Sequence, residues 1–224
     1  MTGLSYLKTY NMAIIYDSTS TSTKVSGVPY TEHSTGHTVT TAENRILVVS
    51  CVNVSGSTIA GVTWDGVAMT DAGLQCGSSY SMSTWYLLNP NSGTKTLEVT
   101  FSAGTVGDII TITSLSGATQ AVEATTGIST TNTTVTGSMG IVFDDSFYVT
   151  TFVADSEPNL TGGETIVSNT DIGSVYLKSG YGTSNIGTLN PNATQTGSSE
   201  FNLNGIAFSL VIIPNNASAL LNFI

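Results

Sequence analysis

Short runs of β-branched and aromatic residues recur along the chain and are separated by clusters of Gly, Asn, Pro and Ser. This pattern is typical of strands joined by turns. No window shows the 3.6-residue period of an amphipathic helix, so we expect an all-β protein with almost no helix. The predicted strands cover residues 12–17, 37–41, 45–53, 60–64, 82–88, 96–101, 108–115, 146–154, 165–168, 174–178 and 205–213.

Two of these runs, 45–53 and 205–213, are apolar on both alternating faces. Strands of that kind are covered on both sides, so we expect both to be central in their sheets. The dipeptide Asp65-Gly66 lies between apolar residues and predicts a type I′ hairpin, because both central positions of that turn need φ > 0. Asn-Pro-Asn sequences at 89–91 and 190–192 predict two further turns.

The two halves of the chain show a faint likeness. Runs at 45–53 and 108–115 enclose a Trp-Tyr-Leu-Leu strand and an Asn-Pro-Asn turn, and runs at 146–154 and 205–213 enclose a Val-Tyr-Leu strand and a second such turn. One interpretation is a pair of four-strand Greek-key halves, as in a jelly roll. The alternative is a chance match between β-rich halves of biased composition. Each half holds few predicted strands for a core of its own, so we expect one two-sheet antiparallel β-sandwich, jelly-roll-like, over residues 26–214.

The two ends of the chain differ from its middle. Residues 1–25 are expected to form a strand and then a flexible segment, because the Ser/Thr tract at 18–23 offers little apolar area to bury. Residues 215–224 form an apolar tail that ends in Ala-Leu-Leu-Asn-Phe-Ile. Such a tail docks on its own domain or on a neighbouring subunit, and the sequence leaves both alternatives open.

Composition narrows the class of protein. Of 224 residues, 40% are hydrophobic and 9% are charged, while 37 are Thr and 29 are Ser. The scarcity of charge argues against coiled coils and helical bundles, and a mean hydropathy of +0.19 argues against a disordered chain. The cysteines Cys51 and Cys76 are too few for a disulfide framework. Cys51 lies in an apolar run and is expected to be buried, and a bridge to Cys76 stays open.

Charge argues against two kinds of partner. Five Lys and Arg against fifteen Asp and Glu give a net charge of −10, which repels nucleic acid and anionic membrane surfaces. No apolar run approaches the ~18 residues of a membrane span. The hydroxyl-rich composition is that of an extracellular protein, yet no export signal follows Met1. We therefore expect a virion protein, made in a host cytoplasm and carried outside on a particle released by lysis.

Three segments carry a resemblance to a known module. Asn-Arg-Ile-Leu-Val-Val at 44–49, Val-Thr-Trp-Asp-Gly-Val-Ala-Met-Thr at 62–70 and Thr-Trp-Tyr-Leu-Leu-Asn-Pro-Asn-Ser-Gly-Thr at 84–94 occur in this order. Together they resemble a β-sandwich module of tailed-phage structural proteins and bacterial surface or exoproteins. The resemblance runs from about residue 28 to residue 214 and implies a jelly-roll or lectin-like sandwich displayed on a particle or cell surface.

Candidate catalytic histidines are few. A nucleophilic site needs a Ser or Cys, a His and an orienting acid. His33 and His37, the two histidines of the chain, lie four residues apart in a Gly/Ser/Thr-rich stretch. They would share one face of an extended strand, but no neighbouring acid or cysteine completes a zinc site. We expect a structural or solvent-exposed role for both.

Paired carboxylates are a second kind of candidate, because two of them can hydrolyse glycosides. Asp144 and Asp145 precede one predicted strand and Asp155 and Glu157 follow it, which separates the pairs by about 25 Å along the strand at roughly 3.3 Å per residue. One shared site is therefore disfavoured. Asp155 and Glu157 with loop carbonyls have the oxygen ligands that suit calcium, without a specific spacing. Glu164 completes the set of candidate acids.

Two tryptophans are candidates for sugar contact. Trp85 lies in an apolar strand and is expected in the core, whereas Trp64 precedes the predicted hairpin and is the better candidate for stacking on a sugar.

The sequence thus predicts no catalytic, cofactor-binding or metal site. We expect a non-enzymatic bacteriophage virion structural protein, as a capsid decoration, head-fibre or tail-associated component, that assembles with copies of itself and with other virion proteins. The alternative is a carbohydrate-binding or host-adhesion module that recognises a host-surface glycan.

Overall fold

The computed structural model describes residues 10–11, 13–73, 79–197, 200–209 and 212–213. Throughout these residues the regular structure is antiparallel β-strand, and no helix occurs among them. The predicted all-β class is confirmed. A helix able to cross a membrane is likewise absent from this part of the chain.

Two long strands organise the first half of the chain. β8 (Gly93–Ser116) pairs with β2 (Ile15–Val39) along its length. On its other side, the first part of β8 pairs with β4 (Ile59–Trp64) and the last part with β3 (Ile46–Asn53). The register of β2 against β8 shifts between Val25 and Glu32, where both strands turn a corner. The sheet therefore folds over on itself and encloses a core.

This folded sheet is a jelly roll, here called the first roll. One layer has the order β6-β7-β3-β8-β2 and the other has the order β5-β4-β8-β2. The core between the layers includes Leu47, Val49, Trp64, Leu97 and Ile112. The remaining strands of this roll are β5 (Val67–Ala68), β6 (Thr70–Asp71) and β7 (Ser81–Leu88).

The second half of the chain repeats this order, and we call it the second roll. Its five-stranded sheet runs β14-β15-β12-β18-β9. Two small sheets, β10-β17-β13 and β11-β16, pack on its outer face over Phe152, Phe201 and Tyr148. The strands are β9 (Ala124–Thr130), β10 (Thr134–Thr136), β11 (Met139–Ile141), β12 (Ser146–Ala154), β13 (Asn159–Leu160), β14 (Thr165–Ile172), β15 (Val175–Ser184), β16 (Gly187–Leu189), β17 (Asn192–Thr194) and β18 (Phe201–Phe208).

The likeness between the halves is therefore structural. β3 lies between β7 and β8 as β12 lies between β15 and β18, and β4 pairs with the first part of β8 as β13 pairs with β17. Each roll encloses its own apolar cluster. The expectation that each half has too few strands to close a core was wrong, because short strands such as β13 and β17 complete the second roll.

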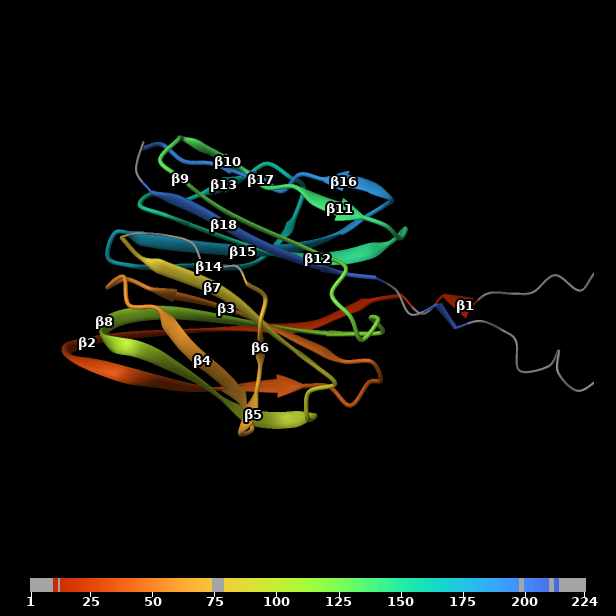
Figure 1. The fold of residues 1–224 in the computed structure, drawn as a ribbon, viewed down its shortest axis with the longest axis horizontal. Helices are drawn as coiled ribbons and strands as arrows, with labels where there is room; N and C mark the ends of the chain where they lie inside the picture. Colours follow the sequence, from red (N-terminus) through yellow and green to blue (C-terminus); the bar gives the residue numbers. More distant parts are fainter. Residues whose placement is uncertain (1–9, 12, 74–78, 198–199, 210–211, 214–224) are drawn as a thin grey trace, which may run out of the picture.

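The two rolls pack sheet against sheet, which gives four layers (Figure 1). Ile46 and Val48 of β3 meet Phe147 and Val149 of β12 in one cluster, and a second cluster lies further along the same interface. Every residue of β3, β12 and β18 is buried. The predicted antiparallel sandwich is confirmed, as is the central position of the strand at 45–53, and the run at 205–213 overlaps the buried strand β18.

Local turn chemistry also follows the sequence. Asp65 and Gly66 have φ values of 51° and 77°, as the type I′ turn requires, and Trp64 pairs with Val67 across the hairpin. Cys51 is buried, as expected, and burial raises its pKa well above the ordinary value. The predicted alternative of a bridge to Cys76 lies outside the described residues.

The Ser/Thr tract at 18–23 is a correction. We expected a flexible segment, but these residues lie inside β2, and each has a partner on β8. The predicted boundary at residue 25 falls within β2, at the corner between Val25 and Glu32 where its register against β8 shifts. The hydroxyl side chains form hydrogen bonds on both faces of the strand, which replaces the apolar burial that the tract lacks.

The start of the first long strand, β2, lies next to the end of the last long strand, β18. The start of β2 and the end of β18 share one cluster through Ile14 and Phe208, and the Thr119 amide donates to Ser209 O at 2.8 Å. Beyond this end, β1 (Tyr10–Asn11) pairs with β19 (Ile212–Ile213), and the pair projects from the body (Figure 1). The predicted tail at 215–224 lies outside the described residues.

Candidate functional site

A row of polar side chains fills the open edge of the first roll, where both layers end in β2. In β2 the tract alternates, so that its serines point into the roll and its threonines point away. Thr21 bonds Ser168 of the second roll at 2.7 Å, for example, while the serines face the two histidines. We call the inward set the edge network. It comprises Ser18, Ser20, Ser22, His33, His37, Asp108 and Ser114.

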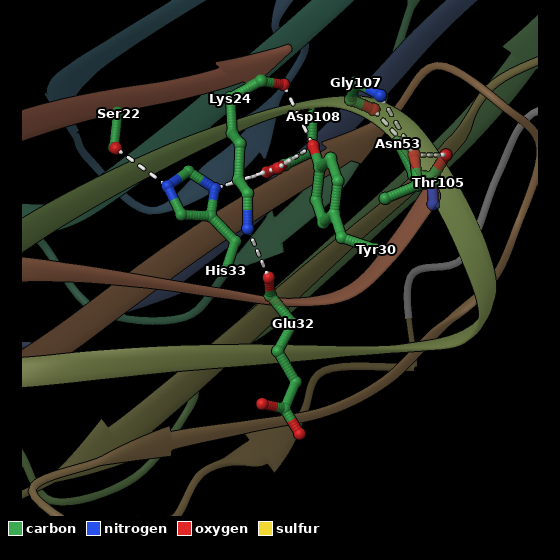
Figure 2. A network of polar contacts seen from close by, with 9 residues as sticks. All are labelled: Ser22, Lys24, Tyr30, Glu32, His33, Asn53, Thr105, Gly107 and Asp108. Carbon is green, nitrogen blue, oxygen red and sulfur yellow. Dashed lines mark hydrogen bonds and ion pairs between the residues drawn. The ribbon is translucent and has the colours of Figure 1, made fainter. Parts of the chain in front are cut away.

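Asp108 is the buried acid of the edge network. It has no exposed surface, and its Oδ2 and Oδ1 lie 2.5 Å and 2.8 Å from His33 Nδ1. The Tyr30 hydroxyl also donates to Oδ1 at 3.0 Å (Figure 2). Because an ionised carboxylate only accepts hydrogen bonds, Nδ1 of His33 carries a proton. These bonds compensate part of the cost of burying the carboxylate.

Ser22 completes a chain of three groups. Its Oγ lies 3.1 Å from His33 Nε2, on the opposite side of the ring from Asp108 (Figure 2). With Nδ1 protonated, Nε2 of a neutral ring accepts the hydroxyl proton of Ser22. Ser22 is half-buried, whereas His33 is buried. The order Ser Oγ, His Nε2, His Nδ1 and Asp carboxylate is the order in which a nucleophile, a general base and an orienting acid are connected.

The side chains of Lys24 and Tyr30 lie beside Ser22, His33 and Asp108 (Figure 2). Lys24 Nζ lies 3.9 Å from the centre of the Tyr30 ring and donates to Glu32 O at 2.7 Å. Lys24 runs beside His33 and Tyr30 (Figure 2). Burial, and then the charge and hydrogen bond of Asp108, raise the pKa of Tyr30 far above its ordinary value. The Tyr30 hydroxyl therefore keeps its proton, and it lies within hydrogen-bond distance of two acceptors, Lys24 O at 2.9 Å and Asp108 Oδ1 at 3.0 Å.

His37 has a different environment in the same row. Its Nδ1 lies 2.7 Å from Ser20 Oγ, and its Nε2 lies 3.2 Å from Ser114 Oγ and 3.4 Å from Ser18 Oγ. Burial lowers the pKa of His37, and the charge of Asp17 opposes that shift. His37 is thus a buried imidazole held by hydroxyl groups.

The structure decides between the two roles expected of the histidines. Both are buried, which excludes the solvent-exposed role and leaves the structural one open. Asp108 supplies the acid that the neighbouring sequence lacked, from a position 75 residues away in the chain. Two signals were available: the strict Ser-Thr alternation at 18–23, and a carboxylate on the same face of its strand as the apolar residues Ile110 and Ile112.

The other candidate acids do not converge. Asp144 accepts from the Ile186 amide at 3.0 Å in the loop before β12. Beyond the other end of β12, Glu157 accepts from Lys178 Nζ and Asn169 Nδ2, both at 2.9 Å, and these bonds lower the pKa of Glu157. Asp145 has a φ of 59°. The predicted separation of the two pairs by the strand is confirmed.

Glu164 stands apart from these pairs. Burial raises its pKa, and hydrogen bonds from the amides of Gly162 and of Glu164 itself oppose that shift. Its charge contributes to raising the pKa of Tyr148 to about 12, after the larger effect of burial. Within the described residues, no three His, Cys, Asp or Glu side chains gather closely enough to hold a metal ion.

Neither tryptophan is available for sugar stacking. Trp64 has no exposed surface, and its Nε1 donates to Asn91 O at 3.1 Å. This burial overturns the expectation that Trp64 could contact a sugar, because the hairpin turns its side chain into the core. Trp85 is in the core, as predicted.

Comparisons with protein-family models, with curated proteins and with solved structures find no match. The sheet topology described above is that of an all-β protein of two stacked jelly rolls. The resemblance to phage and bacterial surface modules stays a prediction.

Proposed function

We propose that this protein is a virion structural component that acts through assembly and surface display. The observation that supports the proposal is the position of β1 and β19. These two strands pair with each other and project from one end of the four-layer body (Figure 1). A body held by its two ends at one pole presents its other pole outward, which is the arrangement that a decoration or fibre protein needs.

An apolar patch beside the chain ends also supports attachment at this pole. Val142, Phe143 and Ile186 are 62%, 43% and 64% exposed. Glu123 accepts hydrogen bonds from the amides of Val142 and Phe143, and the Glu123 amide donates to Ala207 near the end of β18. These bonds fix the loop that carries the patch. Exposed apolar groups held in a fixed loop suit burial against a neighbouring subunit.

The body itself suits long exposure outside a cell. Its three central strands are buried throughout, and two clusters of apolar side chains along one interface hold the rolls together. Hydroxyl side chains on β2 and β8, such as Thr38 and Thr94, bond one another at the surface.

The proposal is tested by particle incorporation. The full chain, and a chain that ends at Pro214, are each supplied to assembling particles that lack the protein. We expect the full chain in purified particles and the shortened chain in the soluble fraction as a folded protein. A third chain, in which residues 215–224 are replaced by ten Ser and Gly residues, controls for length. Equal incorporation of all three chains would count against attachment through the tail.

A further inference from the structure

The two rolls share one topology, so each position of the edge network in the first roll can be compared with the matching position in the second roll. Asp108 pairs with Asn53, the last residue of β3, and Phe201 pairs with Ala154, the last residue of β12. Because β3 and β12 occupy the same place in their rolls, Phe201 is the counterpart of Asp108. In the second roll this position therefore carries an apolar side chain without exposed surface.

The partners of Asp108 have apolar counterparts as well. His33 pairs with Val99, which pairs with Val62 of β4, whereas Val135 pairs with Ala193, which pairs with Leu160 of β13. Val135 is thus the counterpart of His33, and it lies in one apolar cluster with Phe201.

Ser22 follows the same rule. It pairs with Ile110, two residues after Asp108, and Ile128 pairs with Leu203, two residues after Phe201. The polar trio Ser22, His33 and Asp108 therefore stands where the second roll has Ile128, Val135 and Phe201.

The trio is not needed for the topology, since the second roll forms the same edge without it. It also carries a cost, because a buried carboxylate and imidazole lose hydration that their mutual bonds only partly return. A costly arrangement that the fold can do without points to a chemical use. The bonds give one: the trio is connected in the order of nucleophile, base and orienting acid.

We propose that Ser22 is a nucleophile that His33 activates and Asp108 positions, and that it reacts with carboxylate esters. Ser22 Oγ forms a bond to the ester carbonyl carbon while its proton passes to His33 Nε2. The C–O bond to the alcohol then breaks, and the alcohol leaves with that proton. Water attacks the acyl-Ser22 ester by the same route, which releases the acid and restores the Ser22 hydroxyl. No oxidant, metal or further reactant is consumed.

The test is covalent labelling of the full-length protein with a fluorophosphonate, a probe that phosphonylates activated serines. Proteolysis and mass spectrometry then locate the adduct. We expect one adduct per chain, on Ser22, in a protein that contains 28 other serines. Absence of an adduct, or adducts spread over many serines, would overturn the proposal. Because this measurement uses the unaltered chain, it does not depend on whether a variant folds.

Variants separate activation from simple exposure. Ser22→Ala removes the adduct, and His33→Gln lowers the labelling rate at least about 100-fold, because the base is lost. Ser34→Ala is the matched control, since Ser34 is an exposed serine of the same strand that lies outside the edge network. It is expected to label as the unaltered protein does. We expect the same pattern for hydrolysis of p-nitrophenyl acetate: Ser22→Ala and His33→Gln lower the rate, and the control variant does not. Equal labelling of the His33→Gln protein and the unaltered protein would contradict activation by His33.

Discussion

The hydrogen bonds of Asp108 explain how a carboxylate without exposed surface is kept in an apolar roll. The acid accepts from His33 and from Tyr30, and His33 in turn meets Ser22. Removing one partner of the His33–Asp108 bond leaves a buried donor or acceptor unsatisfied, which costs more than the bond itself contributes.

The first prediction compares single and double changes at this pair. Asp108→Leu alone should lower the free energy of unfolding by about 1–3 kcal/mol, because the buried N–H of the His33 ring loses its acceptor. The double variant His33→Val with Asp108→Leu should recover most of that loss, since Val135 and Phe201 fill the same positions in the second roll. Urea unfolding followed by tryptophan fluorescence measures both. Additive losses in the double variant would show that the polar pair is required for the fold.

The second prediction concerns acid. Burial lowers the pKa of His37, so below the ordinary histidine value of 6.5 the unfolded chain binds a proton there more readily than the folded chain. Stability is therefore lost as the pH falls through this window. Between pH 7.5 and pH 5.5 the unaltered protein should lose more unfolding free energy than His37→Gln, whose amide can still bond Ser20. Parallel losses in the two proteins would exclude His37 as the cause.

At the scale of elements, β2 is the strand that decides the architecture. It forms the outer strand of both layers of the first roll, and its corner lets one strand serve both. Its outward face reaches the second roll through Thr21, and its inward face carries the serines of the edge network. Hydrogen bonds between hydroxyl groups therefore hold β2 against its neighbours, whereas β3 is held by the packing of its buried residues.

The third prediction distinguishes a strand from a loop at residues 18–23. These residues pair with β8, so their paired amides should exchange hydrogen slowly, at rates comparable to those of β3. Hydrogen exchange read by mass spectrometry on short peptides measures this. Exchange as fast as that of an unstructured peptide would contradict the pairing of β2.

How far the sequence predicts these elements depends on whether apolar burial forms them. The runs at 45–53 and 146–154 are buried on both faces, and the Asp65-Gly66 turn has one favoured geometry, so local patterns predict all three. The tract at 18–23 has no apolar face, and strands such as β13 and β17 have two or three residues. Their positions depend on pairing with distant strands, which a local pattern does not record.

The candidate site was out of reach for the same reason. His33 meets Ser22 across 11 residues and Asp108 across 75 residues. The pairing of β2 with β8 brings the three residues together. The sequence of either strand alone does not predict which strand it pairs with. What the sequence does carry is the alternation of Ser and Thr in β2, which marks one inward row of hydroxyl groups.

For the whole molecule, the stacking of the two rolls connects the fold to the proposed function. The sheets that face each other bury β3 and β12 on both sides, so each roll covers an apolar face of the other. The same stacking brings the start of β2 and the end of β18 to one pole, from which β1 and β19 project (Figure 1). Attachment at that pole is the central claim.

Incorporation into particles tests this claim most directly. The copy number per particle is measured by quantitative mass spectrometry for the full chain, for the chain ending at Pro214 and for the chain with the Ser/Gly tail. We predict a high, fixed copy number for the full chain alone, with all three proteins equally stable in urea. The same copy number in all three, or none for the full chain, would contradict the account.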